Sequence, residues 1–337
     1  MRPPPKSLAR ARLAVTPVLA AASATLAPEL RRIVEYHWGW CDAAGRPASG
    51  GGGKRLRPTL AVLSAEAVGE PADRALAGAA GVELVHDFTL LHDDVMDQDR
   101  ERRGRPTAWA VFGVGPALCA GDALVLLAQR VLLRDASPAH VAALAALGEA
   151  AETVIAGQAL DLAYEGRVDL GEADWVRMAG QKTAALLGCA ASIGAILARG
   201  PEAAVASLRQ FGCALGLAFQ AVDDWLGIWG RPERTGKPVA SDLRQRKGSL
   251  PIVAALAQPG AAAGALRDFL RAREAPDEAA IARALDALEA CGAEAATRAV
   301  AEREYARAER CLASAPLAPS ARDELLELAS FVVDRES

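Results

Sequence analysis

The stretch 83–107, ELVHDFTLLHDDVMDQDRERRGRPT, decides how the rest of this chain is interpreted. It begins with an apolar helical pattern and ends in a dense block of charge. Asp93, Asp94 and Asp97 form a DDxxD sequence, and helical residues three and four apart share one face. Three carboxylates that close repel one another unless a cation neutralises them. We therefore predict that they project together and bind Mg²⁺, which takes a few carboxylates and leaves its other positions to water and phosphate.

Arginines follow the aspartates directly, at Arg102, Arg103 and Arg105. A guanidinium group matches phosphate oxygens with two parallel hydrogen bonds. A DDxxD alone is equally consistent with a solvated helix face. A second acidic pair, Asp223 and Asp224, lies inside the apolar run FQAVDDWLG. Buried carboxylates need partners, so the two acidic motifs and the arginines together indicate a metal-diphosphate site.

The composition predicts an all-helical protein with a large core. The 337 residues are 52% hydrophobic, and only 4% are aromatic. Alanine and leucine dominate, and both are strong helix formers. Apolar periodicity predicts helices over 72–98, 117–134, 137–164, 172–199 and 202–229, and further amphipathic helices beyond Pro251. Over residues 8–40, we expect helical structure interrupted at Pro17 and Pro28.

Several classes of protein are disfavoured. The net charge of -4 argues against nucleic acid as a general partner. The six cysteines are scattered without metal-binding spacing, which indicates a reducing compartment, and we expect a cytoplasmic protein. There is no uncharged apolar run of membrane-spanning length, so no transmembrane segment is expected. Residues 1–7, MRPPPKS, are predicted to be a disordered leader.

Seven segments together resemble the trans-isoprenyl diphosphate synthases of the polyprenyl synthetase family. They occur in the family's order and cover most of residues 50–251. The segments are GGGKRLRP (51–58), LLHDDVMD (90–97), RRGRPT (102–107), GQALDL (157–162), GQKTAALLGCA (180–190), FQAVDDWLG (219–227) and GKPVASDLRQRKGSLP (236–251). One such motif would be weak, but seven in order are specific.

The resemblance implies a fold, a reaction and partners. We expect residues 8–337 to form one large helical bundle of the isoprenoid synthase type around a central cavity. The implied activity is Mg²⁺-dependent, head-to-tail condensation of isopentenyl diphosphate (IPP) with an allylic diphosphate. Three Mg²⁺ ions are expected with substrate bound, and the resemblance implies a homodimer.

The resemblance also assigns the site residues. It places Mg²⁺ on Asp93, Asp97 and Asp223, with Asp94 as a further catalytic carboxylate. The allylic diphosphate is expected to meet Arg102, Lys182 and Lys237, supported by Thr183, Gln220 and a second, weaker match at Lys247. The IPP diphosphate is expected to be bound by Lys54, Arg57, His86 and Arg103. Gly157, Gln158 and Asp161 would support the wall, while His92 is interpreted as structural.

The resemblance further suggests what limits the product. The growing chain should run down the helix below Asp93, where Phe88 and Thr89 lie five and four residues earlier. A single aromatic residue at the lower position, without an insertion in the DDxxD, resembles the C20 type. The predicted product is geranylgeranyl diphosphate, with farnesyl diphosphate as the alternative.

One position departs from the family pattern. The second motif usually ends in aspartate, but here Gly227 takes that place, which puts the second metal site in doubt. A non-catalytic partner subunit of a heteromeric synthase is therefore one alternative. A class I terpene cyclase is another, but it would need a different second metal motif and would not need Lys54, Arg57 and His86.

Overall fold

The computed structural model describes residues 3–48, 53–230, 239–272 and 274–333, and almost all of its regular structure is helical, which confirms the all-α prediction. The elements, in order, are α1 (Lys6–Ser23), α2 (Pro28–His37), α3 (Leu56–Ala67), η1 (Ala72–Ala75), α4 (Leu76–Met96), β1 (Glu101–Arg102), β2 (Arg105–Pro106), α5 (Ala108–Phe112), α6 (Val114–Leu132), α7 (Pro138–Tyr164), α8 (Glu172–Ala179), η2 (Gly180–Ala184), α9 (Ala185–Leu197), α10 (Glu202–Trp229), α12 (Ser241–Arg244), α13 (Leu250–Leu256), α14 (Ala261–Arg271), α15 (Glu278–Ala290), α16 (Ala293–Ala313) and α17 (Pro319–Val333).

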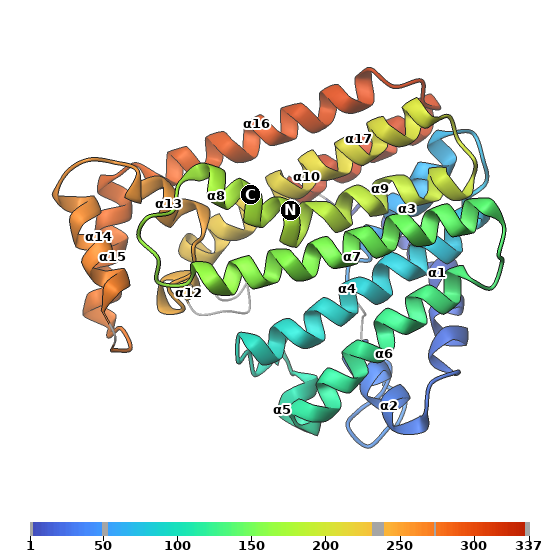
Figure 1. Ribbon diagram of the computed structural model, residues 1–337, viewed down its shortest axis with the longest axis horizontal. Helices are drawn as coiled ribbons and strands as arrows, with labels where there is room; N and C mark the ends of the chain where they lie inside the picture. Colours follow the sequence, from blue (N-terminus) through green and yellow to red (C-terminus); the bar gives the residue numbers. More distant parts are fainter. Residues whose placement is uncertain (1–2, 49–52, 231–238, 273, 334–337) are drawn as a thin grey trace.

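The long helices lie side by side in one bundle, with α9 and α10 near its centre (Figure 1). Helix α10 packs along α9 and α16, α9 packs against α3 and α7, and α4 packs against α6. Buried alanine and leucine side chains fill the spaces between these helices, and small alanines allow helix axes to approach closely. At one end, α14 and α15 form a smaller apolar cluster with α13 and the 240–243 segment.

The apolar periodicity located most long helices. The predicted helix 202–229 coincides with α10, and the predicted helix 137–164 begins one residue later as α7. The predicted helix 172–199 consists of α8, the five-residue π-helical turn η2 and α9. The short α5 and the β1–β2 pair were not predicted, since elements of two to five residues carry too little periodicity to detect.

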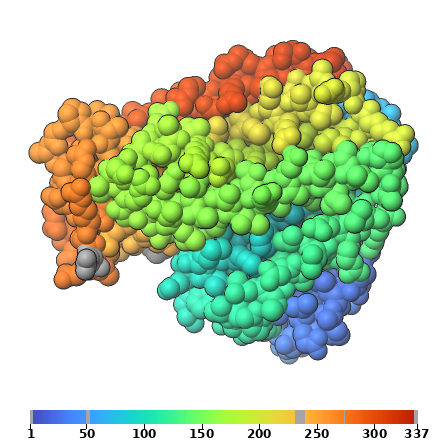
Figure 2. All heavy atoms as spheres, viewed as in Figure 1, coloured from blue at the N-terminus to red at the C-terminus, as the bar shows by residue number. Residues whose placement is uncertain are grey.

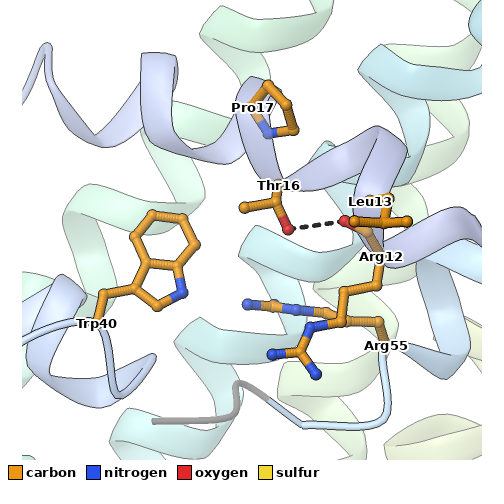
Figure 3. A pocket seen from close by; sticks show the side chains of 6 residues that line it. All are labelled: Arg12, Leu13, Thr16, Pro17, Trp40 and Arg55. Atoms are coloured by element: carbon orange, nitrogen blue, oxygen red, sulfur yellow. Dashed lines mark hydrogen bonds between the residues drawn. The ribbon is translucent and has the colours of Figure 1, made fainter. Parts of the chain in front are cut away.

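The N-terminal helix corrects two predictions. Helix α1 begins at Lys6, so residues 6 and 7 of the predicted leader are helical, and Ser7 is buried against the core. Pro17 lies inside α1 and does not end it. Pro17 and Leu13 are exposed, so water can satisfy the Leu13 carbonyl group that a proline leaves without its helical partner. Figure 3 shows Pro17 beside Thr16, whose hydroxyl donates to the Arg12 carbonyl oxygen at 2.7 Å.

Four helical stretches are long and apolar enough to cross a membrane by length and composition alone: Val114–Leu132, Pro138–Tyr164, Glu172–Leu197 and Glu202–Trp229. Each carries charged residues, which is why a search for uncharged runs did not find them. The last two are mostly covered by other helices, with 72% and 56% of their most apolar windows buried. Helices α6 and α7, both visible in Figure 2, are less covered, with 39% and 33% of their most apolar windows buried.

Candidate active site

A cavity of about 1410 Å³ lies inside the bundle, between α3, α4, α7, η2, α10 and the 241–249 segment. Fourteen of the residues predicted for the site or for chain length line it: Lys54, Arg57, His86, Phe88, Thr89, Asp93, Asp97, Arg102, Arg103, Lys182, Thr183, Gln220, Asp223 and Lys247. Lys237 lies outside the described residues. Segments far apart in the sequence therefore meet in one space, as the motif order suggested.

Two aspartates of the first motif face this cavity from the last turn of α4. Asp93 and Asp97 lie four residues apart at the helix C-terminus, where the helix dipole disfavours negative charge. Burial raises the pKa of Asp93 to about 6; Lys182 opposes this rise, while the charge of Asp97 adds to it. Ionised Asp93 therefore needs cations close by.

The third aspartate of the motif turns away, which corrects the prediction that all three project together. Asp94 is 1% exposed and is not among the cavity-lining residues. One of its carboxylate oxygens accepts a hydrogen bond from Nε of Arg102 at 2.7 Å and lies 2.7 Å from an Nη of the same guanidinium in an ion pair. Asp94 thus orients Arg102, which does line the cavity, and reaches the site through that arginine.

A tight β-hairpin places the arginines. Arg102 pairs with Arg105 across the β1–β2 ladder, and Arg103 and Gly104 form the turn with φ of 55° and 71°. Positive φ at both central residues is the geometry of a two-residue hairpin turn, which glycine accommodates without strain. The turn directs Arg102 toward Asp94 and brings the Arg103 guanidinium against Gly53 of the glycine-rich segment.

The π-helical turn η2 carries Lys182 and Thr183 into the cavity. The Nζ of Lys182 donates to Asp161 on α7 at 2.6 Å. This contact needs α7 and η2 to be very close: a Cβ on Gly157 would overlap the main chain of Gln181 and Lys182. Gly157 therefore acts by having no side chain, and π-helical turns of this kind occur often at functional sites.

Lys247 connects the acidic groups of α4 and α7. Its Nζ lies 2.8 Å from Asp97, 3.4 Å from Asp161 and 3.0 Å from Glu165. Burial would lower the pKa of Lys247, but the surrounding carboxylates outweigh it and raise the pKa. Burial alone would likewise raise the pKa of Asp161, yet the two lysines lower it. Lys247 was the weaker match to the family pattern, after Lys237, but Lys247 lies at the centre of this network.

The two aspartates of the second acidic pair have different surroundings. Asp223 and Asp224 both line the cavity, but Asp224 is only 5% exposed and accepts hydrogen bonds from Trp175 Nε1, Gln220 Nε2 and the Leu250 amide at 2.7–2.8 Å. Burial raises the pKa of Asp224 to about 7, and nearby charge contributes to that rise. Asp224 fixes the turn of α10 from which Asp223 projects.

Asp242, which the sequence analysis did not single out, is an additional carboxylate of this wall. It lies in α12 and lines the cavity with Asp223. A Cβ on Gly227 would overlap its carboxylate group. Asp242 therefore occupies the space beside α10 where the family pattern leads one to expect an aspartate at 227. The signal in the sequence was an aspartate within the basic segment that follows an incomplete acidic motif.

The cavity lining near the start of α3 is cationic and forms the cationic end of the site. Lys54, Arg57 and Arg103 line it together with His86. Burial and the charge of Arg57 keep the pKa of His86 well below its usual range, so the imidazole is neutral at pH 7. A neutral ring can donate one hydrogen bond without adding charge to the cluster.

A buried ion-pair network supports this cationic end. Arg55 begins α3 with a left-handed φ of 53°. Its guanidinium reaches α4, where it bonds Glu83 and lies 3.6 Å from Asp87. Asp87 also accepts from Trp38 Nε1 at 2.6 Å. Arg55 additionally borders a smaller pocket of about 390 Å³ beside α1 (Figure 3). Arg55 thus fixes the start of α3, next to Lys54 and Arg57.

The donor set fits Mg²⁺ bound jointly by protein and substrate. Within the described residues, no group of three or more His, Cys, Asp or Glu side chains is arranged to hold a metal ion. Asp93, Asp97 and Asp223 instead line a shared cavity from two helices. Mg²⁺ typically uses one or two carboxylates together with substrate phosphates and water. This wall suits metal ions that arrive with a diphosphate.

Comparisons with known proteins agree with this site. The family model described as "Polyprenyl synthetase" matches residues 39–288. The chain is 43% identical to the (2E,6E)-farnesyl diphosphate synthase of Mycobacterium tuberculosis H37Rv over 327 residues, covering 96% of this chain and 91% of that protein. It is 41% identical to the geranylgeranyl diphosphate synthase of the same strain over 331 residues, covering 98% and 93%. A crystal structure of a polyprenyl synthetase from Streptomyces coelicolor A3(2) superposes with a TM-score of 0.92 at 46% identity, covering 97% and 98%.

Proposed function

The chain belongs to the polyprenyl synthetase family and is a trans-prenyltransferase, and from this premise we propose that it makes geranylgeranyl diphosphate, with farnesyl diphosphate as the alternative product. The observation that carries the proposal is the single cavity with two chemically different ends and an aromatic residue below its acidic wall. The relatives include synthases named for each product, so the product must be argued from the residues of the cavity.

The two ends of the cavity suit two different diphosphates. At the acidic wall, Asp93, Asp97 and Asp223 would hold Mg²⁺, and the allylic diphosphate would bind there with Arg102 and Lys182 on its oxygens. At the cationic end, Lys54 and Arg57 are close enough to the cavity to bind the IPP diphosphate directly, without a metal. This separation would keep the two substrates in fixed and different orientations, which a condensation requires.

The residues of the chain can perform the steps of the condensation. Mg²⁺, three ions in our proposal, would neutralise the charge that develops on the leaving diphosphate. Lys182 and Arg102 would stabilise the same charge through preorganised hydrogen bonds. Apolar side chains, including Val154, Met178 and Phe219, line the cavity and would exclude water from an allylic cation. The departing diphosphate would accept the proton that restores the alkene, so no protein base is needed.

Phe88 is the residue we propose as the floor that limits chain length. It lies five residues before Asp93 on α4, roughly 7–8 Å further down the helix axis at 1.5 Å per residue. Its ring lines the cavity and is 7% exposed, while the smaller Thr89 turns its hydroxyl to the His86 carbonyl at 2.8 Å. One ring at the lower position and a small residue above it favour a C20 product over C15.

The position of Asp242 argues against the non-catalytic alternative. That alternative depended on Gly227 as a missing carboxylate. Because Asp242 brings a carboxylate to the side of α10 at Gly227, the acidic wall has a further acidic group there. We therefore favour a complete catalytic subunit.

We further propose a cytoplasmic homodimer that associates through α6 and α7. Leu126 on α6 is 60% exposed, Leu133 directly after α6 is 49% exposed, and Val141 on α7 is 50% exposed; none of the three is among the residues that line the cavity. Leu126 and Leu133 are seven residues apart, about two helical turns, and therefore share one face. Both helices lie on the face seen in Figure 2. Exposed apolar side chains on neighbouring helices are typical of a protein interface.

The test is a direct assay of the purified protein. It would be incubated with Mg²⁺ and IPP and, separately, with dimethylallyl, geranyl or farnesyl diphosphate, and the products would be identified by mass. We expect a C20 diphosphate. A C15 product would retain the class of enzyme and replace the product assignment. The absence of product with every primer, or a hydrocarbon made without IPP, would refute the proposed function.

A further inference from the structure

His92, which the sequence analysis interpreted as structural, lies against the residue proposed as the floor. Its ring meets the ring of Phe88 edge to face, with centroids 4.7 Å apart and planes at 68°. Both side chains line the cavity. Edge-to-face contacts of this kind are favourable and fix the relative orientation of the rings. The position of the Phe88 ring therefore depends on where the His92 ring is held.

Helix α6 fixes the His92 ring from the other side. The Nε2 of His92 donates to the Leu118 carbonyl oxygen at 3.1 Å and lies 3.6 Å from an Asp122 carboxylate oxygen. Between these residues is Gly121, which is buried. A Cβ on Gly121 would overlap Cδ2 and Nε2 of the imidazole and lie 3.5 Å from Cδ2 of Phe88.

Gly121 thus leaves a notch in α6 into which the His92 ring fits. Glycine in a helix interior is weaker than alanine, so this position needs a reason specific to its surroundings. The contacts with His92 and Phe88 supply that reason. The imidazole has little freedom to rotate away, because α6 lies on one side and the Phe88 ring on the other.

We infer that His92 and Gly121 set the product length together with Phe88, because the Gly121 notch seats the His92 ring and that ring props the Phe88 ring across the end of the cavity. This inference rests on the proposed role of Phe88. His92 and Gly121 are positioning residues, since they act through Phe88. Removing the imidazole should let the Phe88 ring tilt toward α6 and admit a longer chain. Adding a methyl group at Gly121 should push the imidazole toward Phe88 and shorten the cavity.

The experiment measures product ratios of five variants, one of them Phe88→Ala, with Mg²⁺, IPP and dimethylallyl diphosphate. His92→Ala should raise the proportion of products longer than the wild-type product, and Gly121→Ala should raise the proportion of shorter ones. Each shift should be about tenfold, since one methylene group in an apolar pocket changes selectivity by roughly 10- to 200-fold. The double variant Gly121→Ala/His92→Ala should lose the shortening. Gly115→Ala is the matched control, because it lies on the same helix with nothing within 4 Å of its added Cβ.

The outcomes separate this inference from the floor assignment. A purely structural role for His92 would change thermal stability or total activity and leave the product ratio at the wild-type value. If His92→Ala and the soluble Gly121 variants gave the control ratio while Phe88→Ala lengthened the product, this inference would be wrong and the floor would stand. If Phe88→Ala also left the ratio unchanged, the floor itself would be refuted. Should Gly121→Ala fail to fold, His92→Ala and the double variant still decide the question.

Discussion

Helix propensity favours alanine over glycine at position 157, whereas the packing around the active site opposes it, and Gly157→Ala tests which effect is larger. In an unconstrained helix interior, alanine is more stable than glycine by about 1 kcal/mol. Here the new Cβ would overlap the main chain of Gln181 and Lys182, which cannot rotate away as a side chain could. Overpacking of this kind costs roughly 1–3 kcal/mol. The free energy of unfolding should therefore fall by at most about 2 kcal/mol, because the propensity gain offsets part of the cost.

The expected effect on catalysis is larger. Relief of the overlap must move η2 away from α7, and η2 carries Lys182, whose Nζ is held 2.6 Å from Asp161. A displacement of about 1 Å in a catalytic group can reduce the rate about 100-fold. We expect kcat of Gly157→Ala to fall by about that factor, while the protein remains folded at 25 °C.

The assay combines urea unfolding with steady-state kinetics of condensation. Gly264→Ala in α14 is the matched control, since nothing lies within 4 Å of its added Cβ. It should leave kcat unchanged and raise the free energy of unfolding by up to about 1 kcal/mol. If Gly157→Ala instead matched Gly264→Ala in both measurements, the close approach of α7 and η2 would have no functional role. The proposal that this packing positions Lys182 for catalysis would then be refuted.

Three further substitutions test other parts of the site. Gly227→Asp restores the family's usual acidic spacing but should lower kcat at least tenfold, because the new side chain would overlap and repel the Asp242 carboxylate. The double variant Gly227→Asp/Asp242→Gly should recover part of the lost activity. A gain of activity in Gly227→Asp alone would contradict this prediction. Asp94→Asn removes the charge that orients Arg102, so kcat/KM for the allylic substrate should fall about 10- to 100-fold, and kcat/KM for IPP should fall less. An equal loss for both substrates would contradict the proposal that Arg102 binds the allylic diphosphate. Val141→Glu should convert a dimer to a monomer in light scattering, whereas Ala279→Glu at an exposed position of α15 should not. An unchanged mass for Val141→Glu would exclude this part of α7 from the interface.

The sequence predicted the location of the site better than its internal arrangement. Helical spacing was enough to place His86, Phe88 and Asp93 along one helix and in one cavity. It could not say which of two adjacent aspartates faces inward, because Asp93 and Asp94 differ by about 100° around the axis and either could have faced the cavity. The answer depends on the β1–β2 hairpin, whose Arg102 engages Asp94. A hairpin of two-residue strands leaves almost no periodic signal, although its Arg-Gly turn is visible in the sequence.

The position of Asp242 is a second feature of the site that hydrophobic periodicity does not predict. Its role depends on α12 lying beside Gly227 of α10, and no local pattern fixes that contact. In the sequence alone, Gly227 is a position where an expected acidic ligand is missing. In the folded chain, the absence of a side chain at 227 is what lets a carboxylate from another element approach the helix.

The same relation recurs at three helical glycines around the cavity. Gly157, Gly121 and Gly227 each lie where a side chain or main chain from a neighbouring element would overlap an added Cβ: the main chain at Lys182, the His92 ring and the Asp242 carboxylate, respectively. Each glycine lowers helix stability by about 1 kcal/mol relative to alanine, and none of the three has a positive φ that would require glycine for the backbone. Helix propensity alone would therefore favour alanine at all three. What opposes alanine is the close approach of a group that lines the catalytic cavity, so the positions of these groups are specified as much by missing side chains as by charged ones.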